Sequence, residues 1–178
     1  MKVNTRDFHS LTRRMWDWGR YTCVGLDSAR GKIPKCVVDQ YGSKGDGEVL
    51  FQFNKAIIDT TADIAGFYKL QSAFYEACGS EGFTAQQRTI AYLNAKVPTT
   101  PTISDAKRAD IDNTNLGYVS AIFDQLGFDA VTIHPYLGFK ALAPFFDRKE
   151  KGKIILCRTS IEGGGEFQDL FTLEFDPN

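Results

Sequence analysis

The sequence is poor in the residues that bind zinc or build histidine-based catalytic sites. Its two histidines are His9 and His134, and its four cysteines are scattered without a C-x-x-C pair. A zinc site needs Cys and His at short spacings, and a disulfide framework needs cysteines that can pair. We therefore expect no metal site and no disulfide, with reduced and mostly buried thiols. Any chemistry must then depend on Asp, Glu and Lys.

A basic tract and a long apolar run are also missing. The 178 residues include 21 Lys and Arg against 22 Asp and Glu, which gives a formal net charge of -1. Nucleic-acid binding leaves a basic footprint, and a membrane span needs about 20 apolar residues. The N-terminal segment mixes charges with aromatic residues, unlike a secretory signal. We expect no nucleic-acid partner, no membrane partner and a cytoplasmic location.

Short apolar segments that end in polar residues alternate with longer segments of helical spacing. In one of these, Val49, Phe53 and Ile57 recur every four residues, as on one face of a helix. The expected strands are 21–27, 65–70, 101–107, 129–135 and 152–160. The expected helices are 34–41, 48–63, 72–78, 84–96, 114–126 and 138–147, with a break at 79–82.

This alternation predicts a parallel sheet covered by helices, because parallel neighbours need crossover connections. An open doubly wound sheet and a (β/α)8 barrel both fit. The segment "GLDSARGKIP" lacks the G-x-G-x-x-G spacing of dinucleotide-binding sheets, which favours the barrel. About five strand-helix units can be counted, whereas a closed barrel has about 250 residues. We expect one α/β domain over 1–178, a partial TIM barrel from a truncated gene, a fragment, or a chain that another chain completes.

Charged residues gather where the predicted strands end. Side chains alternate along a strand, so Asp105 and Lys107 in "SDAKRADIDNT" lie on the same side. Asp27 and Lys69 end two other strands, and strand ends meet at the C-terminal face of a barrel, where active sites lie. Buried charges are costly unless they are paired. The pattern therefore predicts a charged site at this face.

An alternative interpretation is that the strand has already ended at this segment. The charges would then form a solvated turn, and Asp110 or Asp112 would cap the helix that follows.

Four other residues receive simpler interpretations. Trp16 and Trp18 predict an N-terminal helix that packs on the underside of the barrel. His134 is expected to hydrogen-bond at the barrel rim, and Asn54 is expected to be a solvated helix residue.

The motif "DAKRADIDNT" resembles the D-x-K-x-x-D-I-x-x-T motif of the orotidine 5'-phosphate decarboxylase family. The flanking segments "CVGLD", "FNKAIIDTTAD", "FYKLQSAFYEACGSEG" and "GKIILCRTS" agree with that family, and they resemble its longer bacterial subgroup. The resemblance runs from about residue 8 to residue 170. It implies a lyase that converts orotidine 5'-monophosphate to uridine 5'-monophosphate in pyrimidine biosynthesis, without metal or cofactor.

The resemblance also implies a role for each matching residue. The charged tetrad is Lys69, Asp105, Lys107 and Asp110, and Lys107 gives a proton to the ring carbon that loses CO2. The substrate-binding residues are Asp27 for the ribose, Ser160 for the pyrimidine, and Ile111 and Thr114 in the motif. Asp110 and Thr114 are lent to the neighbouring subunit, so each site needs a homodimer.

Two departures and two alternatives accompany this resemblance. Leu70 stands where the family has Pro, and Asp112 stands where it has Gly. The family's phosphate-binding loop and arginine would lie beyond residue 178.

One alternative is an inactive fragment or a nucleotide-binding or interaction module. The other is a Mg2+-dependent sugar-phosphate enzyme of the same suprafamily, whose members carry an acidic residue in place of Lys69.

Overall fold

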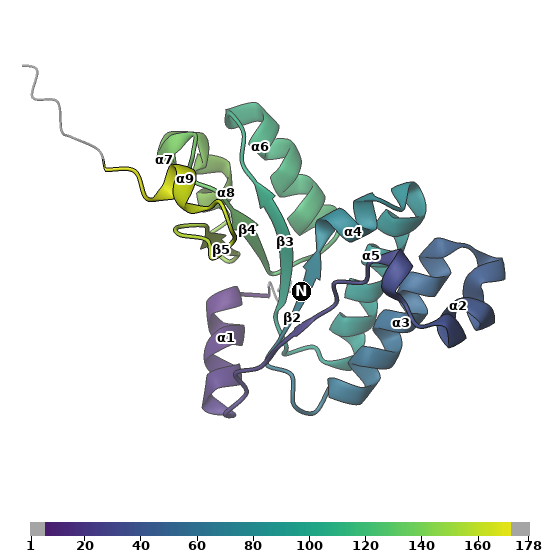
Figure 1. Cartoon of the computed structure of the whole chain (residues 1–178). Helices are drawn as coiled ribbons and strands as arrows, with labels where there is room; N and C mark the ends of the chain where they lie inside the picture. The colour runs from purple at the N-terminus through teal and green to yellow at the C-terminus, as the bar shows by residue number, and fades with distance from the viewer. Residues whose placement is uncertain (1–5, 172–178) are drawn as a thin grey trace, which may run out of the picture.

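The chain folds into a parallel β-sheet with helices packed against it, as the computed structural model shows for residues 6–171 (Figure 1). The strands are hydrogen-bonded in chain order, β1-β2-β3-β4-β5, and every neighbouring pair is parallel. The strands are β1 (Cys23–Gly25), β2 (Phe67–Gln71), β3 (Thr102–Arg108), β4 (Ala130–Ile133) and β5 (Gly152–Ile155).

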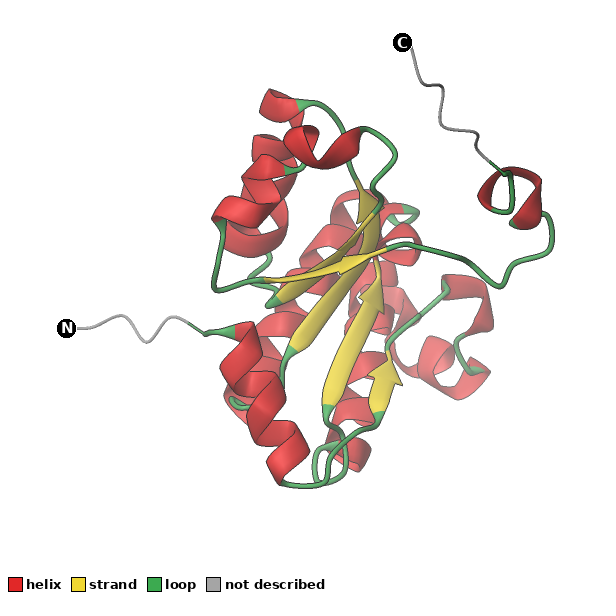
Figure 2. Cartoon of the chain, turned by 90° about the vertical axis from the view of Figure 1, so that its left-hand side faces the viewer, coloured by secondary structure: helices red, strands yellow, loops and turns green. Residues whose placement is uncertain are grey.

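Helical segments connect the strands and lie behind and beside the sheet, whose strands are in view from the other side (Figure 2). The longest two, α3 and α5, pack against each other. The helices are α1 (Phe8–Asp17), α2 (Lys35–Tyr41), α3 (Asp46–Thr61), α4 (Ser72–Glu76), α5 (Gly79–Lys96), α6 (Asp112–Val119), α7 (Gly138–Ala141), α8 (Ala143–Asp147) and α9 (Gly165–Gln168). Two 3-10 helices are also present, η1 (Arg30–Lys32) and η2 (Gly42–Lys44), together with a π-helix, η3 (Ser120–Gln125).

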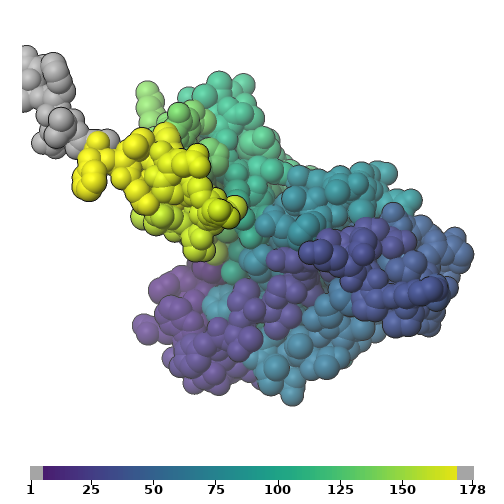
Figure 3. Space-filling model, in the orientation of Figure 1, coloured from purple at the N-terminus to yellow at the C-terminus, as the bar shows by residue number. Residues whose placement is uncertain are grey.

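Several predicted boundaries were wrong, and two of them affect the interpretation of the fold. The strand expected over 152–160 ends at Ile155, and the following segment lies apart from α2 and α3, on the opposite side of the molecule (Figure 3). The break expected at 79–82 lies at 77–78, because α4 ends at Glu76 and α5 begins at Gly79. Gly79, with φ +56, is the first residue of α5, whereas Gly82 is buried inside α5 against the backbone of Tyr75. Gly82 therefore permits a close approach of α5 to α4, whereas nothing lies within 4 Å of a Cβ at Gly79.

The N-terminal helix α1 lies at the end of the sheet where the strands begin. Its Leu11 and Met15 are buried, whereas Trp16 and Trp18 are 52% and 55% exposed. The predicted helix exists and packs at this end through Leu11 and Met15, whereas the tryptophans that indicated it lie outside its apolar face.

An ion pair fixes the chain at the same end of the sheet. Arg6 donates to both carboxylate oxygens of Asp129 at 2.8 Å, and it also donates to the carbonyl of Thr100 at 2.9 Å. Asp129 is fully buried and accepts the backbone N–H of Thr102 at 2.9 Å. A buried charge is tolerated when it is paired and hydrogen-bonded in this way.

The core lies between the sheet and the helices, and the two edge strands are more open. In β5, Ile154 and Ile155 are 39% and 45% exposed. All four cysteines are free, and three of them are exposed. The expectation of mostly buried thiols was wrong, because Cys23 and Cys157 belong to or follow edge strands and Cys36 lies on the outer helix α2.

Between residues 6 and 171, no helix is both long enough and apolar enough to pass through a bilayer.

The close approach at Gly82 leads to a stability prediction. A Cβ at Gly82 would overlap the carbonyl oxygen of Tyr75, so Gly82→Ala should lower the free energy of unfolding by about 1–3 kcal/mol. The control is Gly117→Ala, also in a helix, where nothing lies within 4 Å of the added methyl. Alanine should stabilise that position by about 0.5–1 kcal/mol. Urea denaturation followed by circular dichroism measures both changes in the free energy of unfolding. Equal changes for the two variants would contradict the close contact of Gly82 with Tyr75.

Candidate active site

The carboxyl ends of β1, β2 and β3 bring four charged side chains together. Asp27 follows β1, Lys69 lies in β2, and Asp105 and Lys107 lie in β3. The parallel register aligns Gly25 with Lys69, and it aligns the last residue of β2 with Asp105. The strand ends therefore meet at one edge, as predicted. We call these four residues the charged row.

Opposite charges alternate along the charged row. Lys69 Nζ lies 2.9 and 3.1 Å from the two carboxylate oxygens of Asp27, and it lies 3.2 Å from Asp105 Oδ2. Lys107 Nζ lies 2.6 Å from Asp105 Oδ1. Each ammonium thus has at least one carboxylate within hydrogen-bond distance, and Asp105 bridges the two lysines.

The charged row runs from a sheltered centre to open ends. The side chain of Asp105 is 13% exposed and that of Lys69 is 26% exposed, against 44% for Asp27 and 47% for Lys107. The end members can therefore contact a ligand while the inner members hold them in place.

Ion pairing outweighs burial in setting the pKa values of the two inner members. Desolvation favours the neutral amine of Lys69, but the hydrogen bonds and charges of Asp27 and Asp105 raise its pKa above the ordinary value. Desolvation also favours the neutral acid of Asp105, but hydrogen bonds from Lys107, Thr132 and Lys69 lower its pKa. Both groups are therefore charged at neutral pH.

Two uncharged residues complete the surroundings of Asp105. Thr132 Oγ1, on β4, donates to Asp105 Oδ1 at 2.8 Å and accepts the backbone N–H of Lys107 at 3.0 Å. Gln71 Nε2 lies 3.2 Å from Asp105 Oδ2. Neither residue was predicted from the sequence. The signal was their position, since both are polar residues at or near the end of an apolar strand.

The backbone of β3 changes direction at the charged row. The pairing of β3 with β4 shifts register between Ser104 and Arg108, and Lys107 has φ +47, in the left-handed region. A residue other than glycine rarely adopts this conformation. It is held here by the hydrogen bond from the Lys107 N–H to Thr132.

A buried polar network lies beneath the Asp27 end of the charged row. Asn54 is fully buried on α3 and accepts a hydrogen bond from Ser28 at 2.6 Å. Its amide donates to Tyr75 at 2.9 Å and to Thr89 at 3.0 Å, and the Tyr75 hydroxyl donates to the carbonyl of Leu26 at 2.8 Å. The expectation of a solvated Asn54 was wrong, because this face of α3 packs on α5. The network anchors the residues on both sides of Asp27.

The structure leaves the other predicted site residues outside the charged row. The carboxylate of Asp110 accepts the N–H of Ile111 at 2.6 Å, and within residues 6–171 it contacts neither lysine of the row. Thr114 lies on α6 and is half-buried, and Ser160 is exposed in the loop after β5.

The two simpler interpretations of nearby residues are corrected. The cap of α6 is Ile111, without a side-chain cap bond, so Asp110 and Asp112 do not cap the helix. The backbone N–H of His134 donates to the carbonyl oxygen of Arg108. The imidazole Nδ1 of His134 is buried without a hydrogen-bond partner in the described chain. The expected rim hydrogen bond of the imidazole is therefore not observed.

Within the described residues, no three Asp, Glu, His or Cys side chains are grouped to hold a metal ion. The chemical capacity of the site lies in fixed charge. An exposed ammonium held by a sheltered carboxylate can stabilise negative charge that develops on a ligand and can donate a proton to it.

Two relatives have similar sequences. The orotidine 5'-phosphate decarboxylase of Christiangramia forsetii is 43% identical over 162 residues, which cover 91% of this chain and 57% of that protein. The protein of the same name from Herpetosiphon aurantiacus is 42% identical over 155 residues, covering 87% of this chain and 55% of that protein. The chain thus spans about half the length of these relatives.

Two solved structures have the same fold. The OMP decarboxylase of Leishmania donovani matches with a TM-score of 0.78 at 31% identity, covering 94% of this chain and 60% of that one. The UMP synthase of Leishmania donovani matches with a TM-score of 0.79 at 31% identity, covering 96% and 34%. The predicted fold class, α/β with about the first five units of a TIM barrel, is confirmed.

A family model described as "Orotidine 5'-phosphate decarboxylase / HUMPS family" matches residues 21–175, which include the whole charged row. The match covers most of the chain, and the relatives and the fold agree with it. The chain therefore belongs to the orotidine 5'-phosphate decarboxylase / HUMPS family.

Proposed function

We propose that the charged row is the catalytic centre of an orotidine 5'-phosphate decarboxylase, which converts orotidine 5'-monophosphate to uridine 5'-monophosphate and CO2 in the cytoplasm. The observation that carries the proposal is the alternation of Asp27, Lys69, Asp105 and Lys107 at the strand ends. The names of the relatives support the same reaction. No metal or cofactor takes part in the proposed mechanism.

In the proposed reaction the bond between ring carbon C6 and the carboxylate carbon breaks, and its electron pair stays on C6. Lys107 is the more exposed lysine of the row, and its ammonium lies beside the carbon that becomes negative. Its Nζ then gives a proton to C6 and later regains one from water. Charge that is already in place needs no reorganisation during the reaction, which makes this stabilisation large.

The remaining residues bind the substrate in the proposal. Asp27 is exposed at the open end of the row and accepts hydrogen bonds from the ribose hydroxyls. Ser160 contacts the pyrimidine ring, and Ile111 lines the site. Lys69 and Asp105 position Lys107 and keep it charged.

The proposed enzyme is a homodimer in which Asp110 and Thr114 reach the site of the neighbouring subunit. Two observations support this arrangement. Asp110 makes no contact with the charged row of its own chain. Ile111 and Leu116, which flank Thr114, are 59% and 60% exposed and offer apolar surface beside it. The partner's Asp110 would then lie against the leaving carboxylate, which its negative charge destabilises.

Lys107→Ala tests the proposed chemistry. The variant is made in a chimera that joins this chain to the C-terminal part of the Christiangramia forsetii relative, because the chain spans about half of that protein. Loss of the preorganised ammonium should lower kcat by a factor of about 100–1000 or more. Production of uridine 5'-monophosphate, followed by ultraviolet absorbance, measures the change.

Two controls accompany this experiment. Lys35→Ala removes a lysine whose side chain is 84% exposed on α2, and turnover should be unchanged. A chelator should also leave turnover unchanged. Near-normal turnover by Lys107→Ala would refute the mechanism, and loss of activity with chelator would favour the Mg2+-dependent branch of the family. Turnover by the chimera alone, and none by the 178-residue chain, would show that this chain is an inactive fragment by itself.

The lowered pKa of Asp105 predicts a pH-dependent contribution to stability. A carboxyl group with a lowered folded-state pKa stabilises the fold fully above its ordinary pKa, here 3.8, and this contribution is lost as the pH falls through the folded value. Asp105→Asn should therefore lower the free energy of unfolding by about 1 kcal/mol at pH 7, and the difference should shrink below pH 3.8.

Urea denaturation of the 178-residue chain at several pH values measures this difference. Asp147→Asn is the matched control, because Asp147 is exposed, and its effect should stay small at every pH. A difference for Asp105→Asn that is constant or grows on acidification would contradict the ion-pair assignment.

A further inference from the structure

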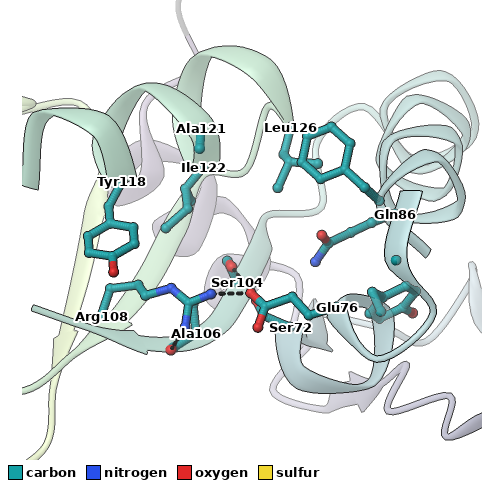
Figure 4. Close-up of a pocket in the computed structure, with 13 residues that line it drawn as sticks. Ser72, Glu76, Gln86, Ser104, Ala106, Arg108, Tyr118, Ala121, Ile122 and Leu126 are labelled. Carbon is teal, nitrogen blue, oxygen red and sulfur yellow. Dashed lines mark hydrogen bonds and ion pairs between the residues drawn. The ribbon is translucent and has the colours of Figure 1, made fainter. Parts of the chain in front are cut away.

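A cavity of about 410 Å3 lies between β3 and helices on the outer face of the sheet (Figure 4). Its floor is formed by Ser104 and Ala106 of β3, whereas the neighbouring residue Asp105 belongs to the charged row. Helices α4 and α5 form one wall, and α6 with η3 forms the other. Successive side chains of a strand point to opposite faces. The cavity is therefore separate from the proposed catalytic centre.

The lining is mostly apolar. Phe83 on α5, Ile122 on η3 and Leu126 face the cavity together with Ala106. Ligand pockets have volumes of about 300–1000 Å3 and are lined by apolar side chains with a few polar groups. The size and lining of this cavity fit that description.

One buried polar group in the cavity has no partner. Gln86 is 3% exposed, and its Nε2 makes no hydrogen bond within the described chain. Its side chain extends from α5 into the cavity (Figure 4). Ser72 Oγ and Ser104 Oγ, two other buried polar groups of the lining, are hydrogen-bonded to each other at 3.2 Å. An unpaired buried donor costs about 1–3 kcal/mol, so the amide is a free donor that a ligand can satisfy.

The mouth of the cavity is polar. Arg108, next to Lys107 on β3, forms an ion pair with Glu76 of α4, and its guanidinium lies 5.4 Å from the centre of the Tyr118 ring. The wall above it is the π-helix η3, a conformation that is rare and occurs frequently at functional sites. Because the charge of Arg108 is already balanced by Glu76, the site does not call for a charged ligand.

The further strands of a complete barrel would not fill this cavity. It lies over β2 and β3, which are interior strands of the sheet, whereas further strands would join at the edges β1 and β5. Completion of the sheet at those edges leaves this space open.

We propose that the cavity binds a small, uncharged and mainly apolar molecule that carries one carbonyl-type acceptor, with Gln86 Nε2 as the hydrogen-bond donor. A molecule of about ten non-hydrogen atoms, such as an aromatic ketone, fits within this volume and offers an acceptor to the unpaired amide of Gln86. The inference goes beyond the decarboxylase proposal and is tested by binding alone, so either can fail without the other.

The test compares two probes of the same shape on the 178-residue chain. Acetophenone carries the carbonyl, and isopropylbenzene replaces it with a methyl-bearing carbon. Saturation-transfer NMR measures binding, and proton–nitrogen spectra follow the side-chain amide of Gln86. Acetophenone should bind about fivefold more tightly than isopropylbenzene and should shift the Gln86 amide. No binding by acetophenone, or equal binding of the two probes, would overturn the proposal.

Two variants locate the site. Gln86→Met keeps the length of the side chain but removes the donor, so the preference for acetophenone should disappear while isopropylbenzene still binds. Ala121→Phe fills the cavity from η3 and should abolish binding of both probes. Gln40→Met, on the exposed face of α2, is the matched control and should behave as the unaltered chain. Unchanged acetophenone binding by Gln86→Met or Ala121→Phe would refute the assignment.

Discussion

Asp105 holds two ammonium groups within hydrogen-bond distance of one carboxylate, and the geometry of the charged row depends on it. Its donors come from three neighbouring strands: Lys69 and Gln71 from β2, Lys107 from β3 and Thr132 from β4. The carboxylate is therefore placed by the pairing of the strands and not by a loop. Sites built on strands are held more closely than sites on loops, which suits a mechanism based on fixed charge.

Buried polar interactions at both ends of the sheet keep the strand ends in register. At one end, the carboxylate of Asp129 joins the segment before α1 to the start of β3 through Arg6 and Thr102. At the other end, Asn54 and Tyr75 join α3 and α4 to the end of β1. Each of these groups is satisfied, so it adds specificity to the fold without the cost of an unpaired buried group.

The sequence predicted what is periodic and missed what depends on tertiary contacts. The strands and the charged row followed from alternation along strands that share one direction, a local pattern that parallel pairing turns into a cluster. Asn54 could not be read in the same way, because a polar residue on a helix looks solvated until the partner helix is known. Gly82 was read as a helix breaker, although its role is to let two backbones approach. Asp110 belongs to the same motif as Lys107, yet one chain does not bring them together.

The left-handed backbone conformation of Lys107 places strain at the residue that carries the most exposed ammonium of the charged row. Between residues 6 and 171 it is the one residue other than glycine with positive φ, a conformation that costs of order 1 kcal/mol or more. Glycine would relieve this strain and would lack the ammonium. Glycine would also remove the ion pair with Asp105, so backbone strain and ion pairing act in opposite directions on the stability of the fold at this position.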